Sequence, residues 1–122
     1  MTKIVLWVSD MDAQIAFYSA LLGLEVDARS EGFVELTSVN NAVLLHELPA
    51  AYRSALPLTA QLAAQTDVAI KPVFRVADVE AARKLVAGSL ASFAEEVVTY
   101  GSSKYLDVVD PEGNVIQIEQ TL

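Results

Sequence analysis

The chain has 122 residues, with 8 Lys and Arg against 16 Asp and Glu, a formal net charge of −8, one histidine and no cysteine. This composition excludes a disulfide framework, a Cys-ligated metal site, and a metal site that needs two histidines from one chain. The acidic balance argues against nucleic acid and no apolar run predicts a membrane span or a signal peptide, so we expect a soluble, cytoplasmic protein.

A strand and a helix are predicted at the start of the chain. Residues 3–8 alternate between two faces, one with Ile4, Leu6 and Val8 and the other with Lys3, Val5 and Trp7. Asp10 then occupies a helix N-cap position, where its carboxylate can accept from free amides of the first turn. Helical spacing continues in an apolar stripe of Met11, Ile15, Tyr18 and Leu22. Gly23 suits the left-handed residue that ends a helix, so we expect the helix to stop there.

Three further strands are predicted in the first half, over residues 24–28, 33–38 and 42–48. Residues 49–67 contain Pro49 and Pro57 and are interpreted as a linker, in which residues 59–65 favour a short helix. The first half is therefore predicted to contain a strand, a helix and then three strands.

The second half of the chain repeats the first. At an offset of 68 residues, residues 4–13 match 72–81 at four identities: Val5, Val8, Asp10 and Ala13 with Val73, Val76, Asp78 and Ala81. Two copies of this length indicate two related modules. We expect a single domain with modules at about 1–48 and 68–122, joined by the linker 49–67.

The elements of the second half follow the same order. A strand over 71–76 precedes Asp78, which is the predicted cap of a helix that ends at Gly88. The apolar positions of that helix are Ala82, Leu85 and Val86. Strands are predicted over 93–99, 104–109 and 114–120, and Pro111, Gly113 and Asn114 are typical of a tight turn before the last strand.

Three motifs resemble one family. Residues 8–24, Val-Ser-Asp-Met-Asp-Ala-x-x-x-Phe-Tyr-x-x-x-Leu-Gly-Leu, look like the first helix of the vicinal oxygen chelate superfamily of glyoxalases, bleomycin-resistance proteins and extradiol dioxygenases. Residues 76–81 and 110–116 are similar to its second module. The resemblance implies an α+β fold of paired βαβββ modules, whose mixed sheets curl around a cavity, usually in a homodimer. It leaves open whether the modules pair within one chain or across two.

The resemblance also assigns four metal-ligand positions. One position in each module is a His or Gln on the first strand, seven residues before the capping Asp. The other position in each module is usually a Glu on the last strand. In this sequence the four positions hold Lys3, Leu44, Lys71 and Gln117. A protonated amine has no lone pair and leucine has no donor atom, so we expect no metal and no other cofactor there.

Strand alternation predicts which side chains line the implied cavity. The candidate ligand-binding residues are Lys3, Trp7, Leu44, His46, Lys71, Arg75, Gln117 and Glu119. The pattern does not determine how residues 33–38 and 104–109 face, so Glu35, Tyr105 and Asp107 are further candidates. Three cations in the lining favour an anionic ligand, whereas a net charge of −8 favours encounter with cations. The charge of the ligand therefore stays open.

The first functional hypothesis is a homodimer that binds or sequesters a small organic molecule. This function is similar to that of the bleomycin-resistance proteins, and Trp7 would stack on a planar group. Nucleic acid and membranes are not expected partners. A structural or regulatory dimer without catalysis also fits the sequence.

The alternative is a metal-independent enzyme of the same superfamily. Two neighbouring lysines, Lys3 and Lys71, would favour loss of a proton from one amine, which suits a Schiff base or a general base. His46 beside Glu35 or Glu119 would suit general acid–base catalysis. The same residues also fit surface roles, with Lys3 solvated, Lys71 protecting an edge strand and His46 at an interface.

Overall fold

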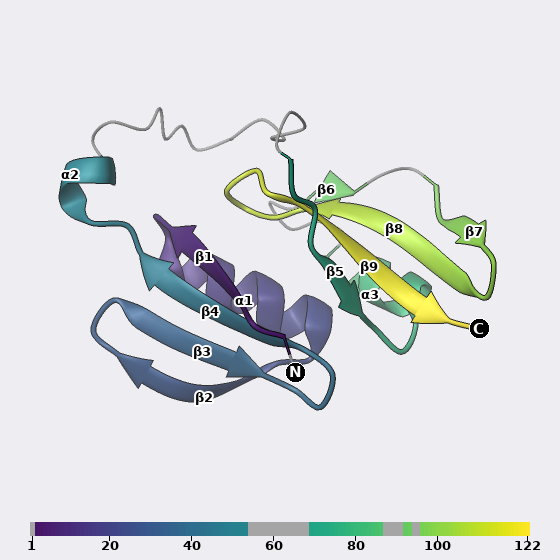
Figure 1. Cartoon of the computed structure of the whole chain (residues 1–122), viewed down its shortest axis with the longest axis horizontal. Coiled ribbons are helices and arrows are strands. Elements are labelled where there is room, and N and C mark those ends of the chain that lie inside the picture. Colours follow the sequence, from purple (N-terminus) through teal and green to yellow (C-terminus); the bar gives the residue numbers. More distant parts are fainter. Residues whose placement is uncertain (1, 54–68, 87–91, 94–95) are drawn as a thin grey trace.

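The computed structural model describes residues 2–53, 69–86, 92–93 and 96–122 (Figure 1). The first half contains β1 (Ile4–Val8), α1 (Met11–Leu22), β2 (Glu25–Ser30), β3 (Phe33–Thr37), β4 (Ala42–Glu47) and α2 (Ala50–Arg53). The second half contains β5 (Val73–Arg75), α3 (Val79–Val86), β6 (Ser92–Phe93), β7 (Val98–Tyr100), β8 (Ser103–Val109) and β9 (Val115–Thr121). The short helix predicted at 59–65 and the helix end predicted at Gly88 lie outside the described residues.

The two halves share one sheet topology. The strand order is β1-β4-β3-β2 in the first sheet and β5-β9-β8-β6 in the second, where β7 also pairs with β8. In both, the first strand of the half runs parallel to its last strand, and the other pairs are antiparallel. The prediction of an α+β fold from paired βαβββ modules is confirmed. The sheets remain two separate sheets and do not close into a barrel.

Local sequence explains where the first long helix begins and ends. The Asp10 side chain accepts a hydrogen bond from the Ala13 amide at 3.0 Å, and Gly23 has φ 63° in the left-handed region. Both predictions for this helix are therefore confirmed. Its core face also includes Gln14, a fully buried polar residue that the apolar stripe did not indicate.

Helix α3 is also capped by an aspartate, but its predicted apolar face is only partly buried. The Asp78 carboxylate accepts from the amides of Glu80 and Ala81 at 2.9 and 3.1 Å. Val86 is buried as expected, whereas Leu85, predicted in the same apolar face, is 64% exposed. Among the described residues, no helix is both long and apolar enough to cross a lipid bilayer.

One predicted strand is divided in the structure. Of the described residues in the predicted strand 93–99, residue 93 lies in β6 and residues 98 and 99 lie in β7; both short strands pair with β8. Residues 96 and 97, before β7, are not in a strand. After this interruption, β7 pairs with the first three residues of β8, and its side chains line a pocket described below.

The core lies between the helices and one side of each sheet. Val8 and Leu45 from the first sheet and Phe74 and Ile118 from the second are almost fully buried in one apolar cluster. Figure 1 shows α1 and α3 behind the sheets, so that the opposite side of each sheet faces the viewer. We call these two sides, which none of the described helices covers, the helix-free faces.

A buried carboxylate joins the two halves. Asp110, which is 2% exposed, accepts hydrogen bonds from the Tyr18 hydroxyl at 2.8 Å and from Gln14 Nε2 at 3.1 Å. It also accepts from the amides of Glu112 and Asn114, each at 2.9 Å. The turn before β9 thereby holds α1 from the other half of the chain.

Two further polar contacts fix the halves against each other. The Glu112 carboxylate accepts from the Ser9 amide at 2.8 Å, just before α1. The Asn41 side chain donates to the Arg75 carbonyl at 2.7 Å and accepts from the Arg75 amide at 3.1 Å. These contacts hold the two halves, and therefore their helix-free faces, in a fixed orientation relative to each other.

Candidate functional site

The helix-free face of the first sheet consists of two rows of side chains. Across β1, β4 and β3 the rows are Val5–Leu44–Glu35 and Trp7–His46–Phe33. This register settles how β3 faces, which the sequence left open. Glu35 lies on the same face as Trp7 because its strand partner Leu44 does.

The second sheet carries two equivalent rows. Across β5, β9 and β8 they are Val73–Gln117–Asp107 and Arg75–Glu119–Tyr105. Asp107 and Tyr105 therefore share a face with the residues that strand alternation predicted there. The first sheet has an aromatic row where the second sheet has a charged row ending in a tyrosine.

Lys3 binds a carboxylate of its own sheet. Its Nζ atom lies 2.5 Å from Glu35 Oε1, across the strand that carries Leu44. The hydrogen bond to Glu35 and the charge of Glu35 raise the pKa of Lys3 above its usual value, and the charge of Asp27 adds to this. Lys3 is thus held as a cation, which opposes a role as a free amine.

The other two cations are also paired. Lys71 Nζ lies 3.2 Å from both oxygens of Asp107, and Arg75 Nη2 lies 3.2 Å from Glu119 Oε1. All three side chains that suggested a basic cavity thus have an acidic partner. The local positive charge inferred from the sequence is neutralised once these partners are included.

The positions assigned to a metal do not fit a divalent cation. Lys3 and Lys71 each point an ammonium group at a carboxylate, and Leu44 has no donor atom. Gln117 offers an amide, but its Nε2 atom donates to Asp107 Oδ1 at 3.0 Å. Within the described residues there is also no group of three His, Asp or Glu side chains placed to hold a metal ion.

His46 belongs to an aromatic cluster. Its ring lies 4.5 Å from the ring of Trp7, with a tilt of 60°, and 6.2 Å from that of Phe33, edge to face. Its Nδ1 atom lies 3.2 Å from the carbonyl oxygen of Glu47. The acid–base pair considered from the sequence is not formed, because Glu35 and Glu119 bind Lys3 and Arg75 instead.

A pocket of about 320 Å³ opens on the helix-free face of the second sheet. Its lining residues are Glu96, Val98, Tyr100, Tyr105, Asp107 and Gln117. The last three were among the residues considered from the sequence, whereas the first three were not, because residues 93–99 were predicted to form one continuous strand. The available signal was the spacing of Val98 and Tyr100, which puts both on one side of a strand.

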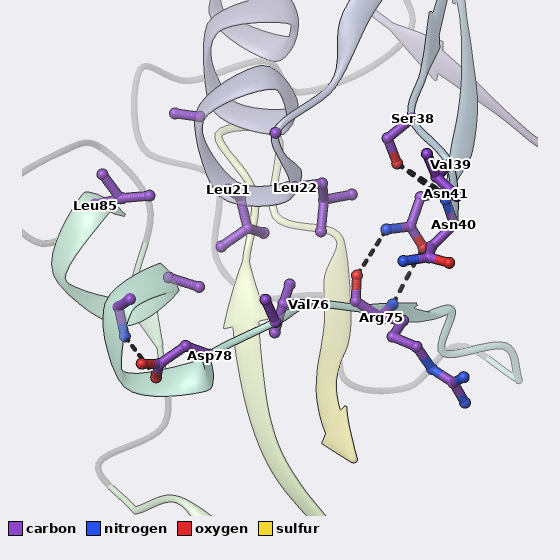
Figure 2. Close-up of a pocket in the computed structure, with 15 residues that line it drawn as sticks. Leu21, Leu22, Ser38, Val39, Asn40, Asn41, Arg75, Val76, Asp78 and Leu85 are labelled. Carbon is purple, nitrogen blue, oxygen red and sulfur yellow. Dashed lines mark hydrogen bonds between the residues drawn. The ribbon is translucent and has the colours of Figure 1, made fainter. Parts of the chain in front are cut away.

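A second hollow, of about 410 Å³, lies at the junction of the halves (Figure 2). It is bounded by the end of α1, residues 38–41 and the segment from Arg75 to Leu85. Figure 2 shows apolar side chains, including Leu21, Leu22 and Val76, around it. The amide of Asn41 is occupied by the Arg75 backbone and the Asp78 carboxylate by the amides of α3. The Asn41 and Asp78 side chains are therefore engaged within the protein.

A comparison of the chain with protein-family models gives a match over almost its whole length. The family model described as "Glyoxalase/Bleomycin resistance protein/Dioxygenase superfamily" matches residues 1–118. No curated protein sequence matches the chain significantly.

Solved structures with the same fold are numerous and distant in sequence. A hypothetical protein from S. aureus has a TM-score of 0.70 at 16% identity, covering 98% of this chain and 92% of that one. A glyoxalase/bleomycin resistance protein/dioxygenase family enzyme from Burkholderia phytofirmans has a TM-score of 0.67 at 23% identity, covering 98% and 97%. A glyoxalase/bleomycin resistance protein from Streptomyces has 0.67 at 18%, covering 97% of each chain. At these identities the likeness establishes the fold.

Proposed function

Since the chain belongs to the glyoxalase/bleomycin resistance protein/dioxygenase superfamily, we propose that it binds or sequesters a small organic molecule without the superfamily's metal centre. The observation that carries this proposal is the pair of equivalent ion pairs, Lys3 with Glu35 and Lys71 with Asp107. They occupy the region that would otherwise supply metal ligands, and they leave a polar but neutral floor. Residues 1–48 and 68–122 act as the two modules, joined by residues 49–67.

Exposed apolar side chains support a partner or ligand on these faces. Val5 and Trp7 on the first sheet are 53% and 54% exposed, and Tyr100 on the second is 78% exposed. Large apolar groups gathered on one face of a soluble domain favour burial by a ligand or a protein. We infer that a second copy of the chain covers the helix-free faces and that the ligand cavity forms between the copies. We further propose that this homodimer acts in the cytoplasm.

Binding is better supported than metal-independent catalysis. A Schiff base needs an unprotonated amine, whereas the contact with Glu35 keeps the proton on Lys3. His46 has aromatic neighbours and a backbone carbonyl beside its ring, rather than a carboxylate that would orient it as a base. These contacts suit recognition of a planar ligand more than proton transfer.

A ligand screen tests the proposal. The purified chain is screened by thermal shift against a library of small organic cations, neutral molecules and anions, since a ligand of the native state raises its stability. Hits are mapped by amide chemical shifts, which we expect to change for residues of the helix-free faces. Incubation of each hit with the protein, followed by mass spectrometry, separates binding from conversion. The proposal fails if the hits map only to the helix side or if every hit is converted.

A further inference from the structure

The charges on the helix-free faces determine what kind of ligand suits them. The three cations there, Lys3, Lys71 and Arg75, are each bound to a carboxylate. Two more carboxylates lie nearby and bind none of these cations. The charge of Asp27 acts on Lys3, and Glu96 lines the pocket. Glu96 makes no ion pair or hydrogen bond with the described residues. The balance of charge at these faces is therefore negative.

The pocket between β7, β8 and β9 combines that charge with aromatic walls. Val98 pairs with Tyr105 across β7 and β8, and Tyr100 pairs with Ser103, so Val98, Tyr100 and Tyr105 share the pocket side of these strands. Tyrosine faces attract cations because the ring carries negative charge above its plane. The same apolar surface suits the hydrocarbon part of an organic ligand.

The floor of the pocket is already neutral. Asp107 is bound to Lys71 and to the amide of Gln117, so its charge is satisfied within the protein. Among the described residues, none forms an ion pair with Glu96, the other carboxylate of the lining. An anionic ligand entering here would meet the carboxylates of Glu96 and Asp107, and Lys71 already shares its ammonium group with Asp107.

We propose that the ligand is an organic cation, held in this pocket with its positive group against Tyr100, Tyr105 and Glu96. This inference rests on the proposed function and names the ligand charge that it leaves open. The ammonium or other cationic group replaces part of its water by two tyrosine faces and a carboxylate, and the attached apolar group lies along Val98. Lys71 and Asp107 hold the floor and do not contact the charge directly.

Two probes of similar size and opposite charge test the proposal. The ¹⁵N-labelled full chain is titrated with benzyltrimethylammonium and, separately, with benzenesulfonate, and dissociation constants are taken from amide shifts. We expect the cation to bind at least about tenfold more tightly and to shift residues of β7, β8 and β9. Glu96→Gln should weaken the cation about threefold, and Tyr100→Leu, which keeps the apolar wall, about two- to fivefold.

Glu80→Gln is the matched control, because it also removes one exposed negative charge but lies on α3, on the helix side. It should leave the affinity for the cation unchanged. If Glu80→Gln weakens binding as much as Glu96→Gln, or if the cation shifts residues elsewhere, the pocket is not the site and the proposal is overturned. If benzenesulfonate binds the helix-free faces more tightly, the cation class is wrong while small-molecule binding stands. If neither probe binds and the wider screen yields no ligand on these faces, both proposals fail.

Discussion

Lys3 and Glu35 form an ion pair across the helix-free face of the first sheet, with the strand of Leu44 between them. The second sheet repeats this arrangement, since Lys71 reaches Asp107 across the strand of Gln117. The two halves therefore preserve the same contact although the acidic partner is glutamate in one and aspartate in the other.

The first prediction concerns metals. After incubation with Zn²⁺, Ni²⁺, Mn²⁺ or Fe²⁺ and dialysis, the protein should retain less than about 0.1 equivalent, because the ammonium groups of Lys3 and Lys71 have no free lone pair. Elemental analysis by mass spectrometry measures the content, and a parallel sample dialysed with EDTA gives the baseline. One equivalent of metal surviving dialysis would contradict the assignment of these positions.

The second prediction concerns the buried junction. Tyr18→Phe removes one donor to Asp110 and should lower the free energy of unfolding by about 1.5–3 kcal/mol, the range for hydrogen bonds to charged groups. Tyr100→Phe is the matched control, since its side chain is largely exposed, and should change stability by less than about 0.5 kcal/mol. Urea unfolding followed by circular dichroism measures both. Equal effects of the two substitutions would mean that the Tyr18 contact contributes nothing.

The third prediction is a loss of stability at high pH. Burial and the charge of Asp110 raise the pKa of Tyr18 above its usual value of 10.0. A group whose folded pKa is raised contributes stability that is complete below the unfolded pKa and is lost as pH rises toward the folded one. Above pH 10 the unfolding free energy should therefore fall by up to about 1.4 kcal/mol per pH unit through this tyrosine.

The comparison of wild type with Tyr18→Phe isolates this effect. Unfolding is measured in denaturant from pH 8 to 11 for both proteins. The difference between them should shrink above pH 10, because the variant lacks the ionising group. A difference that stays constant across this range would show that Tyr18 ionises alike in the folded and unfolded states.

The fourth prediction tests the dimer. Trp7→Glu places a charge on the helix-free face, where the tryptophan is 54% exposed in the single chain, and should convert the proposed dimer into folded monomers. Leu85→Glu is the control, because Leu85 is 64% exposed but lies on the helix side. Sedimentation equilibrium gives the mass and circular dichroism verifies the fold. Loss of the dimer in the Leu85 variant, with the Trp7 variant still dimeric, would place the interface on the helix side.

Several features could be predicted because they depend on a few neighbouring residues. Asp10 and Gly23 mark the ends of α1, since a cap needs only a side chain within a turn of the amides it binds. Alternation placed Trp7 and His46 on one face, and the register shows them side by side. The same local rules failed for Leu85, because helical spacing does not say how wide a face the neighbouring elements cover.

The charge of the site could not be predicted in this way. Alternation identified Lys3, Lys71 and Arg75 but left the strands of Glu35 and Asp107 undetermined. Their partners lie 32 residues from Lys3 and 36 from Lys71, and only the register of the strands brings them together. A cavity that appeared basic from its own strands is neutral or acidic once the adjacent strands are in place.

By itself, the sequence determined the family, the two modules and the faces of most strands, because caps, turns and strand alternation are short-range properties of the chain. The tertiary structure decided which charges are paired, that His46 has aromatic neighbours, and that β7 forms a pocket with β8 and β9. Those features depend on contacts between residues distant in the chain. The net charge of −8 is therefore informative about the ligand only after the positions of the paired and unpaired carboxylates are known.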